Sequence, residues 1–182
     1  MTHFASHLDV RAGGSPGAAA YVVGARWGRF TAYTYADLAR ACDERAHALP
    51  ARGVGPGDRV LVLIPPGFEF FASLFAVLKT GATLVLMDPS VSKAALERCL
   101  TSVRPTAMLG TPAAHLLRRF RSRAFRSVKL ALTTGWWGGT RLALGDATAF
   151  PPVYPPVGEP AAILFTSGAT GAPKGCAYTH AH

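Results

Sequence analysis

The sequence has 182 residues, of which 49% are hydrophobic and 16% are charged. This balance excludes an intrinsically disordered chain and is typical of a single folded core. Lysine and arginine together number 19 against ten acidic residues, which gives a net charge of +9. The surface should therefore attract anions in general, and charge alone does not separate small anions from nucleic acid.

Cysteine content and hydropathy bear on the compartment. Cys42, Cys99 and Cys176 are odd in number and lack the spacing of a zinc site, which favours a reducing, cytoplasmic compartment. The first residues contain no basic segment followed by an apolar block, so no signal peptide is expected. The longest apolar run, Phe70–Leu78, is far too short for a transmembrane helix, and we expect a soluble protein.

Residues 1–58 are predicted to form a hairpin followed by a helix. Two stretches rich in strand-forming residues, Ala18–Val23 and Arg29–Tyr33, are separated by a turn that contains glycine. A helix should then run to about Leu49, with Thr34 as its N-cap.

Residues 59–144 alternate short apolar strands with helices of about a dozen residues. Such alternation implies right-handed crossovers and an α/β fold, in which helices flank a parallel sheet on both faces. The expected strands are Arg59–Ile64, Ala82–Met87, Thr106–Gly110 and Val128–Thr133, and the expected helices are Phe68–Lys79, Val91–Val103 and Ala113–Ala124.

The last two segments differ in composition. Residues 145–160 carry five prolines in their last ten positions, so we expect a linker without a helix or strand. Residues 161–182 begin with the apolar run Ala161–Phe165, which predicts a buried strand that runs directly into a loop. We also expect this strand to leave an unpaired or exposed apolar edge on the sheet.

The loop after this strand carries the groups that bind a polyphosphate. Its sequence is Thr166-Ser167-Gly168-Ala169-Thr170-Gly171-Ala172-Pro173-Lys174-Gly175. Glycines let backbone N–H groups approach anionic oxygens, hydroxyls add hydrogen-bond donors, and Lys174 adds a point charge. A Walker loop is excluded, because Pro173 and Gly175 stand where that motif requires Gly and then Ser or Thr. The alternative is an ordinary polar loop with a solvated lysine.

The order T-S-G-x-T-G-x-P-K-G resembles the phosphate-binding signature of the adenylate-forming (AMP-binding) superfamily. That superfamily includes acyl-CoA synthetases, luciferases and the adenylation domains of peptide synthetases. Tyr33–Leu38 resembles its first short motif, and Phe75–Pro89 resembles its second, a helix-to-strand connection in which Gly81 permits tight packing. Thr134–Thr140 and Ala161–Thr166 are most similar to the β-lactone synthetases of bacterial olefin biosynthesis. The resemblance follows the whole chain in order.

The resemblance implies the N-terminal part of the adenylate-forming fold, incomplete here, and the chemistry of an AMP-forming acid ligase. A carboxylic acid, here a fatty acid, would attack the α-phosphate of ATP, and the acyl group would pass to coenzyme A, another thiol or an internal hydroxyl. The ATP phosphates would be bound by Thr166, Ser167, Gly168, Thr170, Gly171 and Lys174. Mg²⁺ would be needed, with its ligands and the catalytic lysine expected beyond residue 182. No catalytic residue or metal ligand is therefore assigned within these residues, and the chain alone should be inactive.

Two positions affect the site that the resemblance implies. The family usually has a second Ser or Thr where this chain has Ala169. A hydrogen bond to a charged group contributes roughly 1.5–3 kcal/mol, so the missing hydroxyl should weaken nucleotide binding without abolishing it. His180 matches a histidine that helps to shape the acyl pocket in family members. The alternative for His180 is a solvated residue near the chain end.

A basic stretch from Arg118 to Lys129 contains no acidic residue. Apolar residues follow helical spacing there and are expected to face the core, with the arginines on the opposite face; they are Ala113, Leu116, Leu117, Phe120 and Ala124. One interpretation is a solvated helix face, and the other is a docking site for an anionic partner or lipid head group. Because no aromatic series is interleaved with the arginines, nucleic-acid binding is not expected.

The remaining candidates favour structural roles. Trp136 and Trp137 are expected to fill a gap in packing, and His115 to be structural. The acidic residues are scattered, and their spacing indicates neither a paired-carboxylate site nor a nucleophile triad. The rival to an enzyme is a non-catalytic remnant or basic interaction module that keeps the fold without the chemistry.

Overall fold

The computed structural model of this chain describes residues 3–24, 30–88, 91–121, 123–134, 139–155, 158–166 and 174–180. Its helices are α1 (Ser6–Gly14), α2 (Tyr35–Ala48), α3 (Phe68–Lys79), α4 (Lys93–Val103) and α5 (Pro112–Phe120), with a 3₁₀ turn η2 at Pro50–Arg52. Its strands are β1 (Ala19–Gly24), β2 (Phe30–Thr34), β3 (Arg59–Leu63), β4 (Thr83–Leu86), β5 (Ala107–Gly110), β6 (Leu130–Thr133), β7 (Thr140–Arg141), β8 (Ala162–Thr166) and β9 (Lys174–Tyr178).

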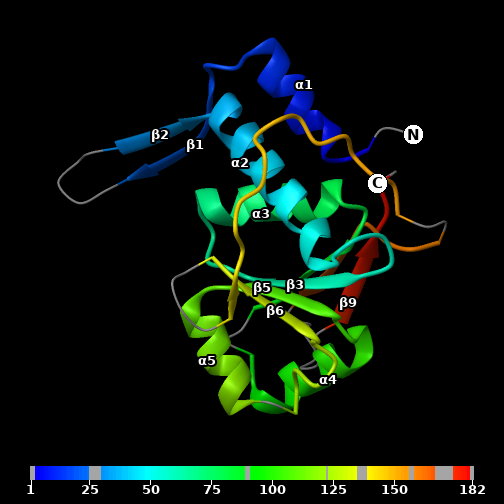
Figure 1. Cartoon of the computed structure of the whole chain (residues 1–182). Helices are drawn as coiled ribbons and strands as arrows, with labels where there is room; N and C mark the ends of the chain where they lie inside the picture. Colours follow the sequence, from blue (N-terminus) through cyan, green and yellow to red (C-terminus); the bar gives the residue numbers. More distant parts are fainter. Residues whose placement is uncertain are drawn as a thin grey trace.

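A seven-stranded sheet forms the centre of the described structure, with the strand order β7-β6-β5-β3-β4-β8-β9 (Figure 1). Neighbouring strands from β7 to β8 are parallel, and the pair of β8 and β9 is antiparallel. The central strand β3 is apolar after its first residue and buried on both faces, as a parallel sheet between two helical layers requires. The predicted α/β fold is confirmed.

The two faces of the sheet bury separate apolar clusters. Side chains alternate along β3, so Val60 and Val62 pack in the cluster with α1, α2 and α3. Leu61 and Leu63 pack in the cluster with α4 and α5. Figure 1 shows these two helical layers on opposite sides of the sheet.

The N-terminal hairpin and its following helix form as predicted. Strands β1 and β2 pair antiparallel and project from the rest of the molecule (Figure 1). Thr34 caps α2 through a reciprocal pair of hydrogen bonds, in which Thr34 Oγ1 accepts from Asp37 N at 3.1 Å and Asp37 Oδ2 accepts from Thr34 N at 3.0 Å. These bonds from Thr34 stabilise the carboxylate and lower the pKa of Asp37.

Helix α5 differs from the prediction in length and orientation. It ends at Phe120 rather than Ala124, and Leu116 and Phe120 are 43% and 77% exposed instead of facing the core. The buried positions are Ala114 and His115. Because 3.6 residues make one turn, a helix that buries these two residues turns 116 and 120 outward. Of the apolar residues expected to face the core, Ala113, Leu116 and Phe120 therefore point to solvent, whereas Leu117 and Ala124 pack in the core as predicted.

Four described elements were not predicted, namely α1, the 3₁₀ turn η2, the short β7, and β9. Strand β9 turns back along β8, with Lys174 opposite Thr166 and Tyr178 opposite Ala162. Strand β8 is therefore hydrogen-bonded on both sides, by β4 and by β9, and the expected unpaired edge at Ala161–Phe165 is wrong. The edge strand at this end of the described sheet is β9, whose five residues are all exposed.

The proline-rich segment has no helix or strand within its described residues, yet it is tightly held along the outer side of α2 and α3. Val153 N donates to Lys79 O at 2.7 Å, and Phe150 N donates to Asp43 Oδ1 at 3.2 Å. Gly81 has a φ of +73°, and a Cβ at this position would lie 3.0 Å from Val153 O. A small residue is therefore required at Gly81, as the sequence indicated.

Candidate functional site

The hairpin of β8 and β9 presents the ends of the predicted phosphate loop. Thr166 closes β8, and its Cα partner across the hairpin is Lys174, the first residue of β9. Ser167, Gly168, Thr170 and Gly171 lie outside the described residues, as does Ala169. The two loop ends thus stand side by side at the carboxyl end of β8, and ligands of open α/β sheets bind at the carboxyl ends of the strands.

A mostly apolar groove of about 710 Å³ opens at this same edge of the sheet. It is bounded by the ends of β3, β4 and β8 and by the start of α5. Its lining includes Leu164 and Phe165 of β8, the two residues before Thr166, together with Ile64, Pro65 and Phe70. Asp88 and Thr111 are its polar residues. One strand therefore contributes to the apolar groove and leads directly into the loop that follows it.

These groups suit a ligand with two chemically different ends. The Lys174 side chain is exposed, so its ammonium can approach a phosphate as a point charge. The groove beside β8 can bury an apolar group of the size found in small-molecule sites. Within the described residues, no group of three or more His, Cys, Asp or Glu side chains is arranged to hold a metal ion.

His180 lies at the other end of β8. Because β9 runs antiparallel, the chain reaches His180 beyond the pair of Tyr178 with Ala162. Phe4 N donates to His180 Nδ1 at 3.3 Å, and the ring centroids of His180 and His3 are 3.9 Å apart. Burial lowers the pKa of His180. The structure does not bring His180 beside Lys174, and its contact with an acyl group stays a prediction.

The other singled-out side chains have structural surroundings. His115 is buried, and its Nε2 donates to Leu132 O at 3.0 Å, while burial lowers its pKa. Cys42 and Cys99 are buried and Cys176 is exposed, and burial raises the pKa of the Cys42 thiol to about 12. Trp136 and Trp137 lie outside the described residues. Among the helices described, none combines the length and hydropathy needed to cross a bilayer.

The sequence analysis did not predict a buried ionic cluster that the structure contains. Lys79 is fully buried, and its Nζ lies 2.6 Å from Asp9 Oδ1 and 2.6 Å from Asp43 Oδ1. Burial works to lower the pKa of Lys79, but hydrogen bonds to Asp43 and Asp9 outweigh it, so the pKa is raised. A lysine at the end of the apolar helix α3 was the available signal, because such a residue needs a partner.

The comparisons with known proteins agree with the fold. The olefin beta-lactone synthetase of Stenotrophomonas maltophilia is 42% identical over 154 residues, which cover 81% of this chain and 28% of the synthetase. That of Xanthomonas campestris is 39% identical over 155 residues, with coverages of 82% and 28%. The chain thus spans under a third of the length of these relatives.

Solved structures agree as well. The apo structure of Mycobacterium smegmatis MbtA is similar with a TM-score of 0.78 at 30% identity, and the match covers 98% of this chain and 34% of MbtA. The N-terminal domain of Mycobacterium tuberculosis FACL13 gives a TM-score of 0.78 at 26% identity, with coverages of 99% and 45%. The sequence profile described as AMP-binding enzyme matches residues 8–182, a range that includes both strands of the loop hairpin, and the chain belongs to this family.

Proposed function

We propose that this chain is the N-terminal, phosphate-binding part of an ATP-dependent acyl-activating ligase. A substrate carboxylate oxygen forms a bond to the α-phosphorus of ATP while the bond to the β-phosphate oxygen breaks, which yields an acyl-adenylate and pyrophosphate. An acceptor thiol or internal hydroxyl then attacks the acyl carbon, loses its proton and displaces AMP. The observation that carries the proposal is the β8–β9 hairpin, with Thr166 opposite Lys174 beside the apolar groove.

The role assigned to this chain is to hold the β- and γ-phosphates. As pyrophosphate leaves, negative charge grows on its oxygens, and donors fixed in advance stabilise that charge best. Lys174 supplies a positive charge, and the glycines allow backbone N–H groups to approach. The hydroxyls of Thr166, Ser167 and Thr170 add hydrogen bonds, with Gly168 and Gly171 shaping the loop. Within the described residues, no cluster of three or more His, Cys, Asp or Glu side chains is arranged to hold a metal ion, and we assign no metal ligand to them.

We propose a fatty acid as the acyl substrate. The groove beside β8 is lined mainly by aliphatic and aromatic side chains, which favour an alkyl chain over a polar amino acid. Coenzyme A and an internal hydroxyl both remain acceptors to be tested.

The test is a fusion of these 182 residues with the remaining part of the Stenotrophomonas maltophilia synthetase. We expect fatty-acid-dependent exchange of labelled pyrophosphate into ATP, and at least a hundredfold loss in Lys174→Ala with little change in unfolding midpoint. A folded fusion without exchange would favour the rival, a non-catalytic remnant or basic interaction module. Activity that survives Lys174→Ala would contradict the role of the loop. The 182 residues alone should show no exchange.

A second variant tests the position at which this loop departs from the family pattern. In the same fusion, Ala169→Ser should restore one donor to the phosphates and raise the affinity or the exchange rate. A hydrogen bond to a charged group contributes roughly 1.5–3 kcal/mol, so a gain of about tenfold or more is expected. Parallel ATP titrations measure it. If Ala169→Ser changes neither quantity while Lys174→Ala lowers both, residue 169 does not contact the phosphates.

A further inference from the structure

The outer face of α5 combines apolar and cationic side chains. Leu116 and Phe120 are one helical turn apart, so both lie on the same side of the helix, and both are exposed. Arg119 is exposed between them in sequence, and Arg123 is exposed just beyond the helix. A large aromatic side chain that is 77% exposed at a helix end among arginines is the pattern of a helix that lies at a membrane interface.

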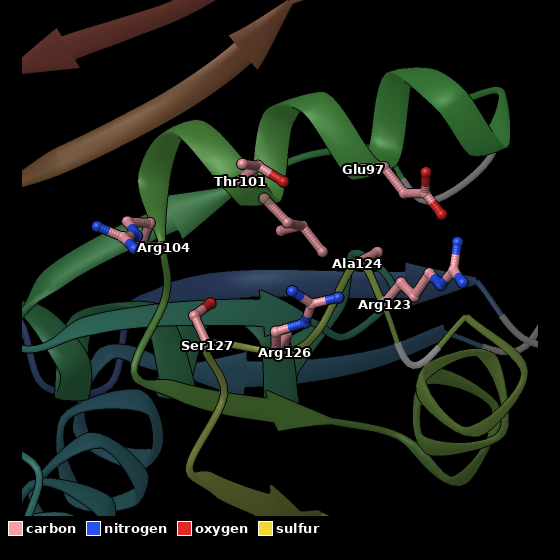
Figure 2. A pocket seen from close by; sticks show the side chains of 8 residues that line it. Glu97, Thr101, Arg104, Arg123, Ala124, Arg126 and Ser127 are labelled. Atoms are coloured by element: carbon pink, nitrogen blue, oxygen red, sulfur yellow. The ribbon is translucent and has the colours of Figure 1, made fainter.

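A groove formed by α4 and by residues that follow the C-terminal end of α5 is lined by arginines and hydroxyls. It has a volume of about 470 Å³ and lies between α4 and the segment 123–128, which follows α5 in the chain (Figure 2). Its lining residues are Glu97, Leu100, Thr101, Arg104, Arg123, Ala124, Arg126 and Ser127. Figure 2 shows Glu97 and Arg123 directed toward one another, which leaves Arg126 and Ser127 in the middle of the groove and Arg104 at its far end.

This groove has the composition of a phosphate site. Guanidinium groups match the geometry of phosphate oxygens, and hydroxyls donate to the same oxygens. Ser127 Oγ is shielded from solvent and has no hydrogen-bond partner among the described residues, so the site offers a donor that is not used internally. Three arginines against the one carboxylate of Glu97 leave a net positive charge.

The positive charge around the groove is also not balanced by acidic residues nearby in the sequence. The sequence has no acidic residue between Glu97 and Asp146, while this stretch contains Arg98, Arg104, Arg118, Arg119, Arg121, Arg123, Arg126, Lys129 and Arg141. Helices α4 and α5 carry this part of the chain on the face of the sheet opposite α2 and α3 (Figure 1). A one-sided positive field of this kind attracts an extended anionic surface.

We propose that α4, α5 and segment 123–128 form a docking surface for membranes that contain anionic phospholipids. Phe120 and Leu116 enter the head-group region, and Arg104, Arg126 and Ser127 hold a lipid phosphate in the groove. The exposed apolar pair favours a lipid surface over a soluble phosphate, because Phe120 and Leu116 can be buried among lipids but not by a free anion. The inference does not depend on adenylation, because lipid binding requires no nucleotide.

The experiment is co-sedimentation of the 182-residue protein with vesicles of phosphatidylcholine, with and without 25–30% phosphatidylglycerol (roughly the anionic fraction needed for a strong surface potential). We expect binding to the anionic vesicles, little binding to pure phosphatidylcholine, and a steep decrease with salt. Phe120→Ser and the double variant Arg104→Gln/Arg126→Gln should each lower the partition coefficient by roughly tenfold. All variants should keep the parent's circular dichroism spectrum.

Matched controls come from the other side of the sheet. Phe30→Ser removes a phenylalanine that is 74% exposed on β2, and Arg11→Gln/Arg40→Gln removes two exposed arginines from α1 and α2. Both controls should bind vesicles like the parent. If the controls lose binding as strongly as Phe120→Ser and Arg104→Gln/Arg126→Gln, attraction is non-specific and the docking surface is wrong.

Two further outcomes would overturn the proposal. Binding of inorganic phosphate that needs Arg126 but not Phe120, without vesicle binding, would make the groove a site for a soluble anion. Loss of vesicle binding in the fusion with the synthetase would mean that the rest of such an enzyme covers this face. Vesicle binding by both proteins, with the same dependence on Phe120, supports it.

Discussion

The two helical layers of this chain treat their cationic residues in opposite ways. In the layer of α1, α2 and α3, Lys79 is fully buried between Asp9 and Asp43. In the same layer Arg45 is 5% exposed, and its Nη2 lies 2.6 Å from Glu69 Oε2. In the layer of α4 and α5, the arginines around the groove are exposed and outnumber the acids beside them. The buried cations of the first layer fix its own helices, whereas the exposed arginines around the groove of the second layer are available to a partner.

The difference follows from the burial of the two layers. A buried charge without a partner is very costly, so the cations of the first layer require carboxylates within hydrogen-bond distance. Exposed arginines keep their hydration and need no such partner. We therefore expect substitutions of the buried cations in the first layer to change stability and substitutions of the groove arginines in the second layer to change binding.

The largest effect should come from Lys79→Ala. The substitution leaves Asp43, which is 6% exposed, buried beside Asp9 without its cation. Breaking a buried ion pair in this way costs about 3–5 kcal/mol of unfolding free energy, which urea denaturation measures. Arg119→Ala on α5 should stay within about 0.5 kcal/mol of the parent. Equal losses for Lys79→Ala and Arg119→Ala would remove the contrast between the layers.

Gly81→Ala should have the next largest effect. The φ of +73° disfavours any side chain, and a Cβ would lie 3.0 Å from Val153 O, so strain and crowding together should cost about 2–4 kcal/mol. Gly53→Ala is the matched control, because Gly53 has a φ of +82° with open space around it. It should cost only about 1–2 kcal/mol. If both variants lose the same free energy of unfolding, a side chain at position 81 is not crowded by the proline-rich segment.

A smaller, pH-dependent effect is expected from His3, which lies under the proline-rich segment. Its Nε2 donates to Val153 O at 3.2 Å, and burial, with His180 nearby, lowers its pKa from 6.5 to about 4. The unfolded chain therefore binds a proton below pH 6.5 that the folded chain takes up only near pH 4. The free energy of unfolding is therefore highest above pH 6.5, and it should fall by roughly 1–3 kcal/mol as the pH decreases toward 4.

The variant His3→Gln isolates this contribution. Unfolding free energies from urea titrations at pH 7.5 and pH 4.5 should differ less for His3→Gln than for the parent. An unchanged pH dependence in His3→Gln would assign the acid sensitivity to other groups.

Much of the fold follows from local sequence. The bounds of α3, Phe68–Lys79, agree with the prediction at both ends. Pro65-Pro66-Gly67 separates the helix from the strand before it, and Gly81 separates it from the strand after it. The order of strands and helices from residue 59 to residue 133 follows from their apolar runs and is confirmed. Such runs are buried on both faces of the parallel sheet and leave a clear pattern.

What the sequence did not reveal depends on contacts between distant residues. Lys79 meets Asp9 and Asp43 across long stretches of chain, and no local pattern marks such a partner. The spacing of Leu116 and Phe120 shows that they share a helix face but not where that face points. Strand β9 is short and exposed, so only its pairing with β8 defines it. The sequence predicted the loop residues of the proposed site, which stay a prediction because most of them lie outside the described residues, and it missed the groove that β8 helps to form.

The most direct test of the account is nucleotide binding by the β8–β9 loop, measured by calorimetry with the 182-residue protein. We predict that ATP and inorganic tripolyphosphate bind with similar affinity, that AMP binds at least tenfold more weakly, and that Lys174→Ala weakens the first two roughly tenfold or more. Arg104→Gln/Arg126→Gln should leave these affinities unchanged, because those arginines belong to the other surface. Equal affinities for ATP and AMP, or triphosphate binding that is unaltered by Lys174→Ala and lost in the arginine variant, would contradict the assignment of the loop as the phosphate site.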